Sequence, residues 1–270
     1  MVRSIIFWML VIIYTVFHGV SVMIVAAIDR SGKGVAAICR SWARLALYTA
    51  RVQVYVEGAD FTEFSGPRIY MSNHQSYFDV FALMAFLPDN ARFVAKKSLE
   101  RIPIFGQAMR AAGTIIIDRK HPEKARKALN RTGSARMGRG IGVIVFPEGT
   151  RSRTGEIGQF KKGGFVLALE SGAAIVPVGV NGSRNILPAN GYRVKPGKIR
   201  ISIGRPIPAG SFSSENKEAL IEKTRREVGR LANLPLEKNP EERSAQETET
   251  NYFVKNENHR AYEHTTMPRV

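Results

Sequence analysis

The sequence predicts an α/β fold in which a mainly parallel mixed sheet is flanked by helices and preceded by an N-terminal membrane-anchoring helical segment. Two observations lead to this prediction. Short β-type runs alternate with helical stretches between residues 52 and 231, and a long apolar run occupies residues 5–28. We therefore divide the 270 residues into an anchor with an amphipathic helix (1–50), an α/β domain (51–235) and a disordered tail (236–270).

The apolar run Ile5–Ile28 has 24 residues and no Lys, Arg, Asp or Glu. A helix of that length spans about 36 Å at ~1.5 Å per residue, slightly more than the ~30 Å hydrocarbon core of a bilayer, so we expect a transmembrane helix that is retained as an anchor. More basic residues follow the run than precede it, so the positive-inside bias places the rest of the chain in the cytoplasm. Arg3 precedes the run, and Arg30, Lys33, Arg40 and Arg44 follow it. A cleaved signal peptide and a re-entrant helical pair broken at His18-Gly19 remain alternatives.

The next segment, residues 34–50, places apolar side chains at helical spacing with Arg40 and Arg44 on another face. This pattern predicts an amphipathic helix that lies along the membrane. A core helix of the soluble domain would show the same pattern.

The α/β domain is predicted from seven runs with β character and four helical stretches between them. The strands are Val52–Val56, Arg68–Ser72, Arg92–Ala95, Thr114–Ile117, Gly142–Phe146, Ala174–Val180 and Lys198–Ile203. The helices are Phe78–Phe86, Pro122–Met137, Gly163–Glu170 and Glu215–Leu231. Pro177, inside one strand, suits an edge or bulge position better than a central ladder.

The charge predicts an anionic partner. Residues 1–235 hold 35 basic and 16 acidic residues, a net charge of +19, against +17 for the whole chain. A membrane surface and nucleic acid both attract such a chain. The apolar run favours the membrane, and no helix-turn-helix, zinc or RNA-reading aromatic pattern is present. Cys39 is the single cysteine, which excludes an intramolecular disulfide and a cysteine-rich metal site.

A first candidate site follows the predicted strand Arg68–Ser72. His74 lies five residues before Asp79, which begins a predicted helix. The carboxylate can bind one ring nitrogen of the histidine while the other nitrogen takes a proton. Two structural alternatives stay open: Ser76 and Asp79 also fit a capping box, and His74 also fits a loop histidine whose hydrogen bonds are satisfied.

A second candidate site is the block Phe146–Ser152 (FPEGTRS), directly after a very apolar strand. Such a loop presents its groups outside the carboxyl edge of the sheet, where open α/β folds bind ligands. The planar fork of Arg151 suits a phosphate. Arg119, at the end of another strand, and Lys97 are expected to join it around an anion. The alternatives are an ordinary polar turn and an ion pair between Asp118 and Arg119.

Four blocks, NHQSYFD, GTIIIDR, FPEGTRS and IVPV, resemble in this order the four motifs of the glycerolipid acyltransferase family, specifically the bacterial 1-acyl-sn-glycerol-3-phosphate acyltransferases. The resemblance covers roughly residues 54–206. It implies acyl transfer from acyl-carrier protein or acyl-coenzyme A to the 2-hydroxyl of lysophosphatidic acid, which gives phosphatidic acid. Together with the basic flank of the apolar run, it leads us to expect an enzyme of the inner (cytoplasmic) membrane with its catalytic domain on the cytoplasmic side.

The resemblance also assigns roles to individual residues. It makes His74 the catalytic base and Asp79 its partner. Six residues match positions that bind the phosphorylated acceptor, Lys97 less closely than the others: Lys97, Arg119, Glu148, Gly149, Thr150 and Arg151.

The sequence contains no Gly-x-Ser-x-Gly elbow, so we expect direct transfer without an acyl-enzyme, a metal or a cofactor other than the acyl donor. The same site would serve another lysophospholipid, glycerol 3-phosphate or a lyso-aminolipid. A non-catalytic basic lipid-binding protein is the remaining alternative.

Overall fold

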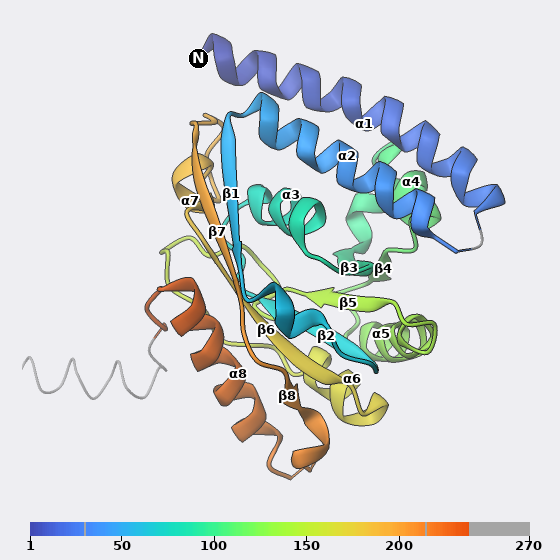
Figure 1. The fold of residues 1–270 in the computed structure, drawn as a ribbon, viewed down its shortest axis with the longest axis vertical. Coiled ribbons are helices and arrows are strands. Elements are labelled where there is room, and N and C mark those ends of the chain that lie inside the picture. Colours follow the sequence, from blue (N-terminus) through green and yellow to red (C-terminus); the bar gives the residue numbers. More distant parts are fainter. Residues whose placement is uncertain (30, 214, 238–270) are drawn as a thin grey trace, which may run out of the picture. The chain divides into compact units, whose positions relative to one another are not determined.

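The computed structural model describes residues 1–29, 31–213 and 215–237. Most of the predicted disordered tail, residues 236–270, therefore lies outside the described residues. Figure 1 shows the fold. The helices are α1 (Val2–Ile28), α2 (Lys33–Thr49), α3 (Tyr77–Phe86), α4 (Phe105–Ala111), α5 (Pro122–Met137), α6 (Gly163–Ser171), α7 (Ser183–Ile186) and α8 (Lys217–Ala232). The strands are β1 (Val52–Glu57), β2 (Arg68–Ser72), β3 (Ala91–Lys96), β4 (Ile115–Ile117), β5 (Gly142–Val145), β6 (Ala174–Asn181), β7 (Gly197–Ile203) and β8 (Ile207–Pro208).

All the predicted strands and helices are present, with ends that differ by a few residues. The short elements α4, α7 and β8 were not predicted from the sequence. Within the described residues the strands form one sheet in the order β1-β7-β6-β2-β5-β3-β4, and β8 also pairs with β6. β6, β2, β5, β3 and β4 run parallel, whereas β7 and β8 run antiparallel to β6. The prediction of a mainly parallel mixed sheet is confirmed.

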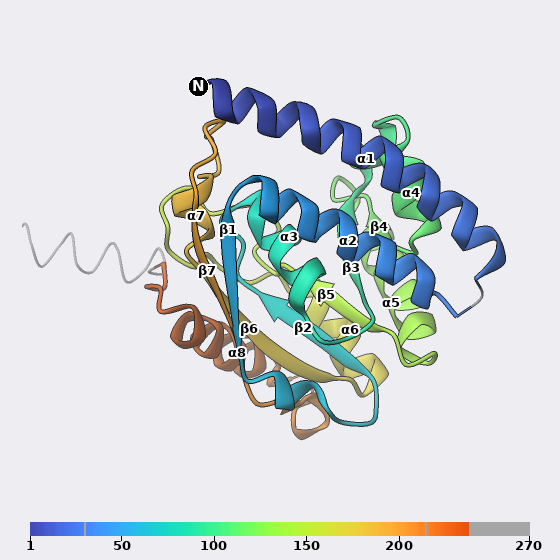
Figure 2. The same ribbon diagram turned by 45° about the horizontal axis from the view of Figure 1, so that its top comes forward.

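Helices cover both faces of the sheet because successive strand residues point to opposite sides. In β2, Tyr70 belongs to a core shared with α2 and α3, whereas Ile69 and Met71 belong to a second core shared with α5, α6 and α8. Figure 2 shows α2 and α3 on one side of the sheet and α8 on the other. Burial on both faces explains why the strands read as short continuous apolar runs.

Pro177 does not lie on an edge strand, so that part of the prediction is wrong. It pairs with Met71 in the centre of the sheet. On the other side of β6, β7 pairs from Val178 onward and β8 pairs at Ile175, so Pro177 faces the connection between these two strands. Its carbonyl oxygen there accepts the Gly204 N–H at 2.9 Å. The missing proline N–H falls at an interruption of the ladder, where it removes no strand hydrogen bond.

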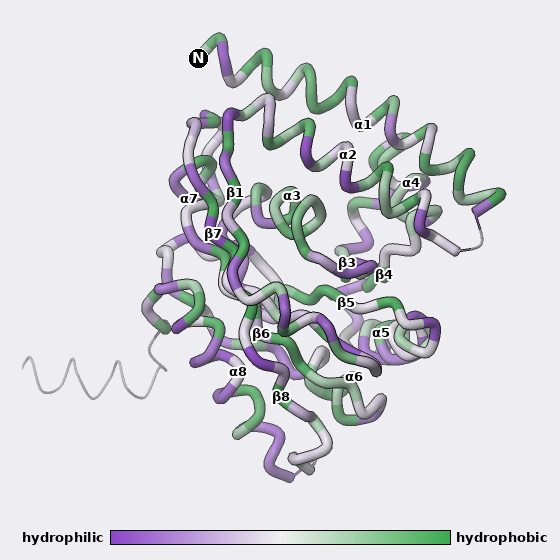
Figure 3. Tube along the Cα trace, viewed as in Figure 1, coloured by the Kyte–Doolittle hydropathy of each residue, from purple (hydrophilic) through white to green (hydrophobic). Residues whose placement is uncertain are grey.

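α1 is one continuous helix, so the alternative of a break at His18-Gly19 is wrong. Of the helices in the described residues, only α1 is long and apolar enough to cross a membrane, and Figure 3 shows its hydrophobic character along most of its length. Its inner face packs on the domain at both ends. Phe7 stacks on Phe78 with ring centroids 5.7 Å apart, and a Cβ at Gly19 would lie 2.8 Å from Ile104 of the segment that leads into α4.

The outer face of α1 is a continuous apolar surface. Its exposed large side chains include Ile5, Met9, Ile12, Ile13, Val16, Phe17, Val20, Ile24 and Ile28. α2 packs between α1 and α3, and its side chains Val35, Ala43 and Leu47 are buried. The core-helix alternative for residues 34–50 therefore holds for this face of α2, and α1 carries the larger exposed apolar surface.

Candidate active site

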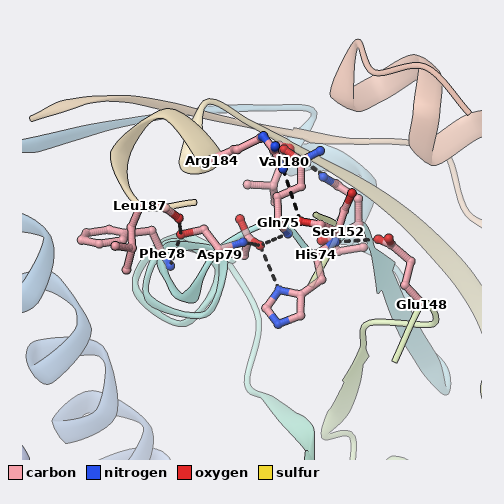
Figure 4. A network of polar contacts seen from close by, with 12 residues as sticks. His74, Gln75, Phe78, Asp79, Glu148, Ser152, Val180, Arg184 and Leu187 are labelled. Carbon is pink, nitrogen blue, oxygen red and sulfur yellow. Dashed lines mark hydrogen bonds and ion pairs between the residues drawn. The ribbon is translucent and has the colours of Figure 1, made fainter. Parts of the chain in front are cut away.

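The predicted site residues lie at one edge of the sheet. His74 follows β2, Glu148 follows β5, Lys97 follows β3 and Arg119 follows β4. These four strands are parallel, so their carboxyl ends meet at the same edge. This is the edge at which open α/β sheets bind ligands. Figure 4 shows the polar network that joins the loops after β2 and β5.

Asp79 orients His74 and caps α3 with the same oxygen. Its Oδ2 accepts a hydrogen bond from His74 Nδ1 at 2.9 Å. It also accepts the backbone N–H groups of Gln75 at 2.7 Å and Ser76 at 2.8 Å. The side chain is fully buried. The histidine–carboxylate hydrogen bond and the capping box expected from this spacing are therefore both formed.

The His74 ring is fixed on two sides. Its face stacks on Phe146, with centroids 4.0 Å apart and an interplanar angle of 13°. With Nδ1 donating to the carboxylate, Nε2 is an acceptor nitrogen. Nε2 points away from Asp79 (Figure 4) and makes no hydrogen bond within the described residues. The side chain is 15% exposed, which leaves this nitrogen accessible to a substrate.

Glu148 holds the backbone of His74 by a hydrogen bond. Its Oε1 accepts the His74 N–H at 2.8 Å, and its Oε2 accepts the Gly158 N–H at 3.2 Å. The residue is 8% exposed. Burial raises the pKa of the Glu148 carboxyl to about 7, against the opposite effect of these two hydrogen bonds. Both oxygens are directed to backbone groups rather than outward.

Further contacts clamp the loop after β5 onto the loop after β2. The Ser152 N–H donates to the His74 carbonyl oxygen at 2.7 Å, and Gln75 Nε2 donates to the Gly155 carbonyl oxygen at 2.7 Å. Arg184 donates to the carbonyl oxygens of Ser152 and Arg153. The first and second candidate sites are thus one site.

Cationic groups converge on Gly149. Arg119 Nη1 donates to the Gly149 carbonyl oxygen. A Cβ at residue 149 would lie 2.9 Å from Lys161 Nζ, and its φ of +76° is one that glycine adopts without strain. Burial lowers the pKa of the Arg119 guanidinium. Thr150 follows with an exposed side chain.

Arg151 stacks on an aromatic ring of the first motif. Its guanidinium carbon lies 3.9 Å from the centroid of the Tyr77 ring. Its Nη1 is buried and has no hydrogen-bond partner in the part of the chain that the structure describes. An unpaired buried donor on a cation is a place for an anionic acceptor.

Lys97 lies at the exposed rim of the site. Its Nζ is 3.5 Å from Asp118 Oδ2 and its side chain is 62% exposed. Asp118 therefore pairs with Lys97, and the alternative of an ion pair between Asp118 and Arg119 is not formed.

Several contributors to this site were not predicted from the sequence: the stacking roles of Phe146 and Tyr77, the approach of Lys161 to Gly149, and Arg184. Phe146 and Tyr77 stand inside the two motifs, but their partners come from other strands. Strand order was needed to find them.

Comparisons with known proteins show which family this chain resembles. A family model described as Acyltransferase matches residues 53–181. The chain is 34% identical over 172 residues to a chloroplastic 1-acyl-sn-glycerol-3-phosphate acyltransferase of Arabidopsis thaliana, covering 63% of this chain and 48% of that protein. It is 32% identical over 193 residues to a 1-acyl-sn-glycerol-3-phosphate acyltransferase of Pseudomonas aeruginosa, covering 70% of this chain and 73% of that protein. The matched region thus spans about half the length of the plant relatives.

The fold is also similar to a solved structure. The crystal structure of the 1-acyl-sn-glycerophosphate (LPA) acyltransferase from Thermotoga maritima superposes with a TM-score of 0.73 and 27% sequence identity. The match covers 85% of this chain and 95% of that chain. The likeness therefore extends well beyond the two motif loops.

The raised pKa of Glu148 predicts a pH-dependent stability. In the folded chain this carboxyl keeps its proton up to about pH 7, against an ordinary pKa of 4.5. Between these values the folded chain binds more protons than the unfolded chain. The contribution of Glu148 to the free energy of unfolding should therefore fall by ~3 kcal/mol as the pH rises through this window.

Chemical unfolding of the wild type and of Glu148→Gln across this window measures the effect, because titrations elsewhere cancel in the difference. The free energy of unfolding of Glu148→Gln, relative to that of the wild type, should increase from pH 4.5 to about pH 7 and stay constant at higher pH. A difference that does not change with pH would contradict the assignment.

Proposed function

Because this chain belongs to the 1-acyl-sn-glycerol-3-phosphate acyltransferase family, we propose that it transfers an acyl chain from a thioester donor to the 2-hydroxyl of 1-acyl-sn-glycerol 3-phosphate, giving phosphatidic acid. The donor is acyl-carrier protein or acyl-coenzyme A. The observation that carries the proposal is the accessible Nε2 of a histidine whose Nδ1 is held by a buried carboxylate.

The reaction that fits this geometry is general-base acyl transfer. The acceptor hydroxyl attacks the thioester carbonyl carbon while Nε2 of His74 takes its proton. Asp79 stabilises the imidazolium that forms, as the carboxylate does in a serine-protease triad. The carbon–sulfur bond then breaks, and the leaving thiolate takes the proton from the imidazolium. A positioned base of this kind contributes roughly 10²- to 10⁴-fold to the rate.

Direct transfer without an acyl-enzyme is supported by the environment of Ser76. Its hydroxyl donates to the Leu187 carbonyl oxygen at 2.7 Å and accepts the Phe78 N–H at 3.2 Å. It is fully buried, so it serves the helix cap and is not available as a nucleophile. In this proposal no metal or further cofactor takes part.

The acceptor phosphate would bind to the cations beside the histidine. Arg151 offers an unpaired buried Nη1, and Arg119 and Lys161 lie at Gly149. Thr150 adds an exposed hydroxyl, and Lys97 adds charge at the rim. We assign Glu148 a positioning role, because its oxygens hold backbone N–H groups. Gly149 serves by letting the cations approach.

Membrane attachment would use the outer face of α1. The inner face packs on the domain from Phe7 to Val22, so the helix can enter a bilayer only sideways. We therefore propose that α1 lies along the cytoplasmic leaflet of the inner membrane rather than crossing it, with the catalytic domain on the cytoplasmic side. The acceptor lipid then reaches the site by diffusion within the membrane.

His74→Ala tests the base. It should lower the rate of phosphatidic acid formation by at least ~10²-fold, because no other group takes the proton, while binding to lipid vesicles is unchanged. His121→Ala, at an exposed histidine before α5, is the matched control and should keep full activity. Comparable turnover in His74→Ala would remove this residue from the mechanism.

Arg151→Ala tests the acceptor site. Loss of a charge-assisted contact should raise the KM for lysophosphatidic acid roughly 10- to 100-fold and leave the KM for the acyl donor nearly unchanged. Arg153→Ala, two residues further and exposed, is the control and should change neither value. Steady-state kinetics with each substrate varied in turn measures both, and an unaltered acceptor KM in Arg151→Ala would refute phosphate binding there.

A further inference from the structure

A second cationic site lies at the opposite edge of the sheet. A cleft of about 620 Å³ opens between the α1–α2 turn, the end of α4 and the end of α5. Figures 1 and 2 both show these segments on the same side of the fold. Arg92 at the start of β3 and Ile141 just before β5 line it. These positions are at the amino ends of the strands whose carboxyl ends carry Lys97 and Phe146.

The cleft is separate from the candidate active site. Four residues of β3, 93–96, lie between Arg92 and Lys97, which are therefore five steps apart along the chain. At ~3.3 Å per residue they place the two sites about 16 Å apart along the strand. None of the residues assigned above to catalysis or acceptor binding lines the cleft.

Three arginines line this space: Arg92, Arg136 and Arg139. Arg92 is 8% exposed, and it donates to Asn90 Oδ1 at 2.6 Å and to the Gly32 carbonyl oxygen at 3.3 Å. Its partners are neutral. Arg136 and Arg139 make no side-chain hydrogen bond or ion pair within residues 1–29, 31–213 and 215–237. Three cations in one cleft therefore lack a carboxylate partner.

Asp29 is the single acidic residue that lines the cleft, and its carboxylate already accepts hydrogen bonds from backbone N–H groups. Its Oδ1 accepts the N–H groups of Ser31 and Gly32, and its Oδ2 accepts the Gly34 N–H at 2.7 Å. These bonds begin α2. Burial lowers the pKa of Arg92, and the positive charge of Arg136 lowers it further. The local charge is thus in excess and would be relieved by an anion.

The cleft opens beside the outer face of α1. Ala26 and Asp29 line it, while Ile24 and Ile28 next to them are 62% and 80% exposed. If this apolar face lies in the membrane, the cleft sits at the depth of the lipid headgroups. Guanidinium forks match the oxygens of a phosphate, which is the anion present at that depth.

We propose that this cleft binds the phosphate group of an anionic phospholipid of the membrane, as a second lipid site distinct from the acceptor site. The proposal rests on the proposed membrane attachment of α1. It does not depend on the chemistry of His74.

Photocrosslinking with a site-resolved readout tests it. The full-length protein is bound to phosphatidylcholine vesicles that contain a phosphatidylglycerol with a photoreactive headgroup, and the crosslinked peptides are mapped by mass spectrometry. The wild type should be labelled around residues 26–35 and 111–113. Arg136→Gln with Arg139→Gln should lower this labelling by roughly 10-fold, since the charge-assisted contacts to the phosphate are lost.

The matched control replaces Lys124 and Arg131, which are exposed on the same helix but do not line the cleft, by Gln. This control also removes two positive charges, so both variants lose the same general attraction to an anionic surface. Because it keeps the arginines of the cleft, its labelling should stay within about twofold of the wild type. All three proteins should unfold at the same temperature and acylate lysophosphatidic acid at the same rate in detergent. Activity missing from the wild type would count against the proposed function and leave the labelling result intact.

Inorganic phosphate separates the two sources of the ligand. If it raises the unfolding temperature of the wild type but not of the Arg136 and Arg139 variant, and no cleft peptide is labelled, the cleft holds a soluble phosphate and the lipid assignment is overturned. Labelling that is equal in all three proteins, or confined to other peptides, would overturn the site itself.

Discussion

A single buried carboxylate oxygen, Asp79 Oδ2, sets the geometry on which the rest of the site depends. It receives three N–H donors: the ring of His74 and the backbones of Gln75 and Ser76. The backbone donors fix the start of α3, and the ring donor fixes the tautomer of the histidine. Because one oxygen does both, the orientation of the base is built into the helix cap. Rotating His74 away would leave a buried charge with fewer partners, which is costly.

The sheet gives this site its partners. Parallel strands bring the loops after β2, β5, β3 and β4 to one edge, where Glu148 binds the backbone of His74 and Arg151 stacks on Tyr77. The opposite edge carries a different group of arginines beside the end of α1. Two groups of cationic side chains therefore lie at the two ends of the same strands. One end faces the proposed chemistry and the other faces the proposed lipid surface.

Local patterns were sufficient for most of the fold and for the first motif. Short apolar runs of β character placed the strands, and the five-residue spacing placed Asp79 next to His74, since both lie in one strand–helix junction. Contacts between distant segments could not be predicted, because they depend on strand order. Pro177 looked like an edge residue and lies in the centre of the sheet, where the break between β7 and β8 accommodates it. Tyr77 contacts Arg151 of the loop after β5, and Lys161 approaches Gly149 within the long connection between β5 and α6.

The tautomer of His74 tests the central claim most directly. Nitrogen NMR of histidine-labelled protein in micelles at alkaline pH distinguishes the protonated from the unprotonated ring nitrogen, and loss of signals in His74→Ala identifies this ring. The account predicts a proton on Nδ1, hydrogen-bonded to Asp79, and a bare Nε2 that is able to take the proton of the acceptor hydroxyl. A ring that carries its proton on Nε2 would contradict it, because that nitrogen could then not serve as the base.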